Sequence, residues 1–163
     1  MDNTPDFVYG GTDGTITTFA IVAGAAGANL DPSIILVLGL TKVIADGFSL
    51  AASRYLSAKT EEDVLGQPRI PSPLSSAIST FLSFVLMGMV PLISFVYGYF
   101  MHRNGNEMYP YAYFFTFLSL VFIGYIRGRY TQTNTMHNIT QTVIIGGMTA
   151  LIAYFVAKKI SGL

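Results

Sequence analysis

Charged residues are scarce in this chain, and cysteine is absent. Asp, Glu, Lys and Arg make up 11% of its 163 residues, whereas a soluble domain carries about 25%. A water-exposed surface of this size needs more charge than that, but lipid removes the need. The composition therefore predicts an integral membrane protein. The missing cysteine excludes disulfides and thiolate metal sites.

Several signatures of other protein classes are also missing. The formal net charge is zero and the nine Lys and Arg residues are scattered, so no nucleic-acid partner is expected. The chain has no phosphate-binding loop, no nucleophile elbow and no His-x-x-x-His spacing. These absences argue against an enzyme and against a tightly bound cofactor. The polar N-terminal residues include acids but no Lys or Arg, which is not typical of a cleavable signal peptide.

Five segments are candidates for crossing a bilayer, which takes about 20 mostly apolar residues per helix. The last three are strongly apolar. The first is rich in Gly, Ala and Thr, and the second contains Lys42 and Asp46, so both give weaker signals. The pattern predicts one all-α transmembrane domain over residues 1–163, with five helices at residues 13–30, 33–57, 74–101, 109–127 and 139–160.

Short polar segments join these helices and leave no room for a soluble domain. The longest covers residues 59–73, is rich in charge and proline, and is expected to form a loop. Gly88 and Pro91 predict a kink in the third helix. Helix ends on the N-terminal side of the bilayer carry five basic residues and the opposite ends carry three. This bias predicts a cytoplasmic N-terminus.

Three charged residues fall inside the predicted helices, namely Asp13, Lys42 and Asp46. Each costs about 2.5–3.5 kcal/mol at the centre of a membrane, so such residues mark functional sites. Lys42 and Asp46 are one turn apart on one helix face. The same face also holds Ser49, Leu50 and Ser53. It would line an ion or proton path, because carboxylates bind divalent cations and also carry protons.

Each of these residues also has a purely structural interpretation. Asp13 could cap the N-terminus of the first helix, where its oxygen would accept hydrogen bonds from free N–H groups. Lys42 and Asp46 could form an intrahelical salt bridge, which is compatible with a path. Small residues at positions 20, 24, 28, 153 and 157 would let helix backbones approach closely, within one bundle or between subunits.

A series of different short motifs occurs in a specific order along most of the chain. Asp13-Gly14 opens the set, and Ala45-Asp46-Gly47-Phe48-Ser49 follows in the second helix. The other segments are residues 19–24, 27–29, 55–59, 61–63, 89–92, 122–125, 127–128, 145–147 and 153–154. Together they resemble the vacuolar iron transporter family, the carriers of ferrous iron and manganese in plants, yeast and bacteria.

The resemblance implies a homodimer in the lipid bilayer, with an ion path at or near the subunit interface. It also implies exchange of a divalent cation for protons, with Asp13 in the path. The chain departs from the family by having Lys42 in place of a glutamate and Leu50 in place of a methionine. Residues 59–73 also replace the metal-binding domain that many members hold there.

Lys42 is the most consequential departure. Two unit positive charges about 4 Å apart repel by roughly 4 kcal/mol at an intermediate dielectric. A charged Lys42 in the path would therefore hinder a metal ion. Either Asp46 holds the ammonium aside, or burial neutralises it, in which case Lys42 could itself carry protons.

The sequence thus predicts a dimeric secondary transporter that moves Fe²⁺ or Mn²⁺ against protons. Asp13 and Asp46 would bind the metal, while Lys42, Ser49 and Leu50 would modulate the path. One alternative is a divergent relative that carries another solute or only protons. Another is an accessory membrane protein that transports nothing. The short chain favours a prokaryotic inner membrane, with a vacuolar membrane as the alternative.

Overall fold

The computed structural model describes residues 2–103 and 105–162, and over these residues it contains helices and no strand. The predicted all-α membrane bundle is confirmed. The helices are α1 (Thr4–Gly27), α2 (Pro32–Leu65), α3 (Pro73–Met89), α4 (Ile93–Phe100), α5 (Tyr109–Thr131) and α6 (Thr135–Ile160). Short 3₁₀ turns at Val90–Leu92 and Gly105–Met108 precede α4 and α5.

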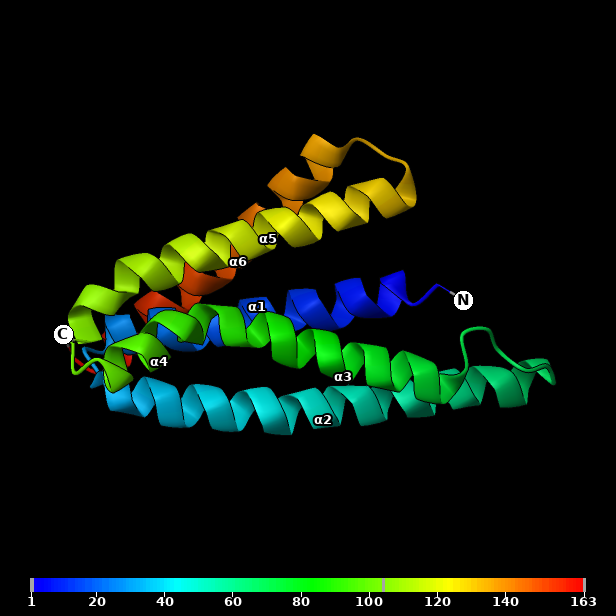
Figure 1. The fold of residues 1–163 in the computed structure, drawn as a ribbon, viewed down its shortest axis with the longest axis horizontal. Coiled ribbons are helices and arrows are strands. Elements are labelled where there is room, and N and C mark those ends of the chain that lie inside the picture. The colour runs from blue at the N-terminus through cyan, green and yellow to red at the C-terminus, as the bar shows by residue number, and fades with distance from the viewer. Residues whose placement is uncertain (1, 104, 163) are drawn as a thin grey trace.

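The central element of the bundle is α1. It packs against α2, α3, α5 and α6, whereas α2 packs mainly against α3 and α5 against α6. The N- and C-termini lie at opposite ends of the elongated molecule (Figure 1). Because α3 and α4 follow one another along a single path, the described chain runs the length of the bundle five times.

Hydropathy alone supports four of these passes. Pro32–Leu65, Pro73–Phe100, Gly105–Thr131 and Thr135–Ile160 are long and apolar enough to span a membrane. The remaining pass is α1, in which glycine, alanine and threonine are abundant. Its central position explains this composition, because the surrounding helices shield it from lipid. The five-helix prediction therefore rests on hydropathy for four helices and on packing for α1.

Small residues let α1 and α6 approach closely. A Cβ atom on Gly27 would lie only 2.3 Å from the carbonyl oxygen of Tyr154, so a larger residue there would have to displace backbone. One turn earlier, Gly24 faces Ala153 and Ala157. The small-residue stripes therefore serve packing within one chain, which was one of the two interpretations left open by the sequence.

The predicted kink in the third pass occurs at Pro91. There α3 gives way to the 3₁₀ turn at Val90–Leu92 before α4 begins. Proline cannot donate the helical hydrogen bond, so the regular α-helix is interrupted at this point. Leu92 is fully buried, and a Cβ atom on Gly39 of α2 would lie 2.7 Å from its side chain.

The first helix begins earlier than predicted. It starts at Thr4 rather than residue 13, with Pro5 in its first turn. Asp13 therefore lies in the helix interior, about two and a half turns from the start. The interpretation of Asp13 as an N-terminal cap is wrong.

The second helix ends later than predicted. It continues to Leu65, and Gly66 follows in the left-handed conformation with φ of 63°. The loop predicted for residues 59–73 is thus helical in its first half. Lys59 supports this extension by pairing with Asp63 at 3.2 Å, one turn further along. Figure 1 shows this end of α2 extending past the N-terminus of α1.

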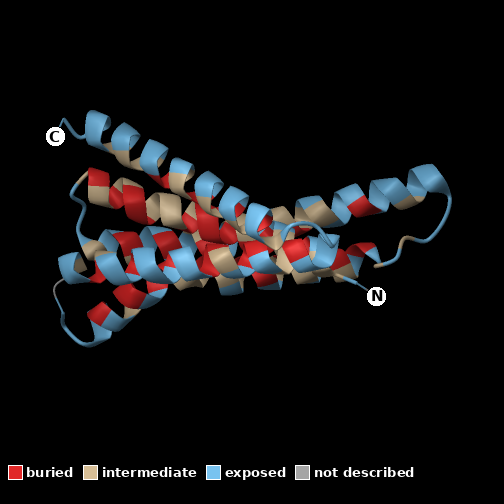
Figure 2. Ribbon diagram, turned by 90° about the horizontal axis from the view of Figure 1, so that it is seen from above, coloured by how far each residue is buried: buried red, intermediate tan, exposed pale blue. Residues whose placement is uncertain are grey.

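Large apolar side chains cover the outer faces of the bundle. Phe48 on α2 is 70% exposed and Phe155 on α6 is 63% exposed. Exposed residues occupy much of the length of α6, the helix that leads to the C-terminus (Figure 2). Such faces are a liability in water, whereas in a bilayer they contact acyl chains.

Candidate cation path

Asp13 of α1 and Lys42 of α2 lie within electrostatic range of each other. Asp13 is half-buried, and Lys42 is near enough for its charge to act on the Asp13 carboxylate. The backbone carbonyl of Asp13 accepts a hydrogen bond from Thr17 Oγ1 at 2.7 Å. Within the described part of the chain, the carboxylate itself forms no hydrogen bond or ion pair. A carboxylate without a partner inside a membrane bundle is available to a cation or a proton.

Lys42 forms the ion pair with Asp46 that the spacing on α2 suggested. The Lys42 side chain is 29% exposed and that of Asp46 is 47% exposed, so both reach the surface of the single chain. The bridge engages the Asp46 carboxylate and neutralises much of its charge. Of the two predicted metal-binding aspartates, only Asp13 therefore forms no salt bridge within the described residues.

Ser49 and Leu50 continue along α2 from this pair. Ser49 is exposed and Leu50 is half-buried. A hydroxyl can serve as an oxygen ligand, whereas leucine has no lone pair to offer. Among residues 2–103 and 105–162, no group of three His, Cys, Asp or Glu side chains could hold a metal ion. A cation here would need further ligands from water or from a second chain.

A buried ion pair that the sequence analysis missed joins α1 to α2. Nε of Arg54 donates a hydrogen bond to Oδ1 of Asp6 at 2.6 Å, and Asp6 is 2% exposed. Asp6 precedes Asp13 by seven residues, so the two aspartates lie on the same side of α1. That spacing could have indicated that both aspartates belong to one helix face. It gave no such indication because the helix was predicted to begin at residue 13, which left Asp6 outside it.

A cavity of about 470 Å³ adjoins this buried pair. Tyr9 of α1 and the hydroxyls of Ser53 and Ser57 on α2 line it together with the two charged residues. Ser53 belongs to the polar face that also carries Lys42 and Asp46. The polar face of α2 therefore ends in a cavity beside the N-terminal part of α1.

Several buried hydroxyl side chains, which carry no charge, lie on α1 and on the helices packed against it. Thr15 Oγ1 donates to the Gly11 carbonyl at 2.9 Å, and Ser119 Oγ of α5 donates to Thr15 Oγ1 at 3.4 Å. Thr18 and Thr80 are buried with hydroxyls that have no partner among the described residues. Such hydroxyls lower the hydropathy of α1 but offer a metal far less than a carboxylate does.

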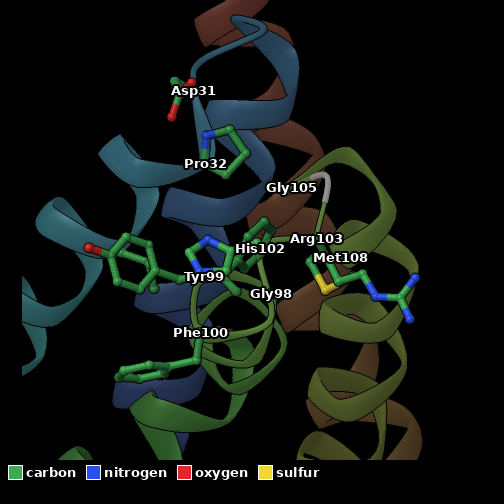
Figure 3. Close-up of a pocket in the computed structure, with 11 residues that line it drawn as sticks. Asp31, Pro32, Gly98, Tyr99, Phe100, His102, Arg103, Gly105 and Met108 are labelled. Carbon is green, nitrogen blue, oxygen red and sulfur yellow. The ribbon is translucent and has the colours of Figure 1, made fainter.

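A second hollow, of about 540 Å³, lies at the other end of the bundle between the α1–α2 turn and the α4–α5 connection (Figure 3). His102 lines it, as does Asp31, whose Oδ1 caps α2 by accepting from the Ser33 amide at 2.8 Å. The Ser33 hydroxyl and amide hold the pKa of Asp31 below its usual range. Asp31 is the only carboxylate among the described lining residues, and it serves the helix cap.

The chain is similar to known sequences over most of its length. The sequence model of the VIT family matches residues 4–69 and 64–158, and the two matches meet at the α2–α3 connection. Vacuolar iron transporter 1 of Tulipa gesneriana is 28% identical, covering 95% of this chain and 86% of that protein. Vacuolar iron transporter 1 of Oryza sativa subsp. japonica is 26% identical, covering 95% and 84%.

Both alignments span 216 positions, which exceeds the 163 residues of this chain, so these relatives contain insertions. Over a shorter stretch, the vacuolar iron transporter of Toxoplasma gondii is 48% identical, covering 34% of this chain and 18% of that protein. The family model, by contrast, covers nearly all of the helical bundle, from α1 through α6. On this ground the chain belongs to the VIT family.

Proposed function

We propose that this protein is a secondary transporter that moves a divalent metal cation, Fe²⁺ or Mn²⁺, across a membrane in exchange for protons. The observation that carries the proposal is Asp13 in the interior of the central helix, whose carboxylate has no hydrogen-bond or ion-pair partner among the described residues. Carboxylate oxygens bind such cations and also take up protons. Relatives named vacuolar iron transporters support a metal ion as the cargo.

The polar faces of α1 and α2 form the path in this proposal. Asp13 binds the metal ion and, in the return step, a proton. Asp46 assists when it is released from Lys42, and Lys42 sets the charge that the cargo meets. Ser49 adds a hydroxyl oxygen. Leu50 supplies no thioether, which favours the harder Mn²⁺ over Fe²⁺.

A second copy of the chain completes the path. Asp46 and Ser49 remain partly or fully exposed on the single chain, where hydrocarbon would otherwise surround them. Exposing a charge to lipid is costly, and packing two α2 faces together would enclose these groups. The working arrangement is a homodimer with its N-termini in the cytoplasm, in a prokaryotic inner membrane or a vacuolar membrane.

A carrier of protons alone is the second candidate. The Lys42–Asp46 bridge favours it, because among the described residues the pair leaves Asp13 as the single carboxylate on these faces that forms no salt bridge. One carboxylate suffices for a proton but gives a dication few ligands.

Flux measurements on the purified protein in liposomes distinguish the candidates. We expect uptake of Mn²⁺ or Fe²⁺ to drive protons the other way, and Asp13→Asn to reduce both fluxes to the level of empty liposomes. Asp63→Asn is the matched control, since Asp63 is 65% exposed at the far end of α2 and should retain the wild-type rate. Proton flux without metal flux would favour the second candidate. Movement of neither ion under a pH gradient would contradict both.

A further inference from the structure

A groove unrelated to the cation path separates α4 from the start of α5. It encloses about 780 Å³, and apolar and aromatic side chains from both helices line it. Among them are Ile93 and Tyr97 of α4 and Tyr111 and Phe115 of α5. These helices belong to passes that are long and apolar enough to span a membrane, an arrangement that would place the groove against lipid.

The walls of the groove remain accessible from the bilayer. Ile93 is 49% exposed and Phe115 is 38% exposed, and both line the groove. An occupant must be apolar along this part, because the walls offer it hydrocarbon and ring faces. An acyl chain meets that requirement.

One end of the groove is charged. Arg103 and Glu107, both from the connection between α4 and α5, line it there. Arg103 takes part in no ion pair within the described residues. Figure 3 shows its side chain beside Met108, with the guanidinium directed toward α5. Glu107 already makes a contact within the chain, but a carboxylate has about four acceptor positions and can take a further donor.

The order of these features matches an amine-headed phospholipid. A guanidinium is the preferred partner of a phosphate, and a carboxylate accepts hydrogen bonds from an ammonium. Tyrosine side chains prefer the boundary between headgroups and hydrocarbon, and Tyr97 and Tyr111 line the groove. We propose that the groove holds one phospholipid of the phosphatidylethanolamine class, with its phosphate on Arg103, its ammonium on Glu107 and an acyl chain between α4 and α5.

The absence of tryptophan from the chain allows a direct test. Phe115→Trp places a single fluorophore in the groove wall, and lipids with brominated acyl chains quench it on contact. We expect brominated phosphatidylethanolamine to quench at a several-fold lower mole fraction than brominated phosphatidylcholine or phosphatidylglycerol. Phe122→Trp is the control, because Phe122 is 50% exposed two turns further along α5 and outside the groove. All three lipids should quench it equally.

Headgroup recognition is tested in the same Phe115→Trp background. We expect Arg103→Gln to remove the quenching by brominated phosphatidylethanolamine at low mole fraction. We expect Glu107→Gln to abolish the preference for phosphatidylethanolamine over phosphatidylcholine. Arg129→Gln, at the exposed opposite end of α5, should change neither. Equal quenching by the three lipids in the Phe115→Trp protein would overturn the site, and this readout does not depend on either variant folding. A preference for phosphatidylglycerol would overturn the role of Glu107 and with it the amine headgroup.

Discussion

In the proposed path, Lys42 would determine how much negative charge the α1–α2 face presents to a cation. Its ammonium pairs with Asp46 and acts at longer range on Asp13, so one positive charge serves two carboxylates. Two like unit charges about 4 Å apart repel by roughly 4 kcal/mol at an intermediate dielectric. Because both side chains of the bridge reach the surface, the repulsion that a metal ion would meet in the proposed path is smaller than that.

Replacing Lys42 and Leu50 together should change which ion passes. Lys42→Glu exchanges the repelling charge for a carboxylate, and Leu50→Met supplies a thioether suited to Fe²⁺. If the repulsion between Lys42 and the metal ion is about 4 kcal/mol, removing about a third of it lowers the barrier to passage enough for a roughly tenfold faster step. We expect the double variant to take up Fe²⁺ about tenfold faster than the wild type in proteoliposomes. The measurement is the initial rate of Fe²⁺ uptake at equal protein density.

Lys42→Gln serves as the control for charge alone. It should release Asp46 and raise uptake of Mn²⁺ and Fe²⁺ to similar extents, since it adds no soft ligand. If the folded double variant gains no Fe²⁺ flux over Lys42→Gln, then Leu50 does not set the choice between metals.

At the scale of elements, the buried Asp6–Arg54 ion pair connects α1 to α2. The two side chains are 3% and 20% exposed, so water screens the pair poorly. Removing one member of a buried pair leaves an uncompensated charge, which costs about 3–5 kcal/mol. Removing both members avoids that penalty and costs much less.

We therefore expect Arg54→Gln to destabilise the protein by about 3–5 kcal/mol, because the Asp6 carboxylate stays buried without its cation. The Asp6→Asn/Arg54→Gln double variant should recover most of this loss. Helix content followed by circular dichroism during detergent unfolding measures both free energies. A double variant as unstable as Arg54→Gln would mean that packing, and not charge, explains the loss. Arg129→Gln, on an exposed position, controls for a change at any arginine.

The four apolar passes could be predicted from the sequence because their hydropathy directly reflects burial in lipid. The start of α1 and the end of α2 could not, because those segments mix charged residues such as Asp6 and Lys59 into a helical pattern. The Lys42–Asp46 bridge could be predicted because its two residues are only four positions apart on one helix. The Asp6–Arg54 pair joins residues 48 apart, and only the packing of α1 on α2 reveals it.

At the scale of the whole molecule, the least apolar helix occupies the centre. A lipid-exposed helix with the composition of α1 would insert poorly, because glycine and hydroxyl side chains gain little from hydrocarbon. Surrounded by α2, α3, α5 and α6, the same residues give close packing and leave Asp13 half-buried. The termini at opposite ends of the molecule require that α1 cross the bilayer if the other passes do (Figure 1).

Single-cysteine labelling tests that crossing, since the chain has no cysteine of its own. Asp2→Cys and Leu30→Cys place exposed thiols at the two ends of α1. In bacterial cells that express each variant, we expect an impermeant maleimide to label Leu30→Cys directly and Asp2→Cys only after the membrane is permeabilised. Gln67→Cys should behave like Asp2→Cys, and Ser161→Cys like Leu30→Cys. Labelling of Asp2→Cys and Leu30→Cys from the same side would leave α1 outside the set of spanning helices, and Asp13 could then not lie in a path through the membrane. The reverse sidedness for all four variants would invert the predicted orientation but keep the crossing.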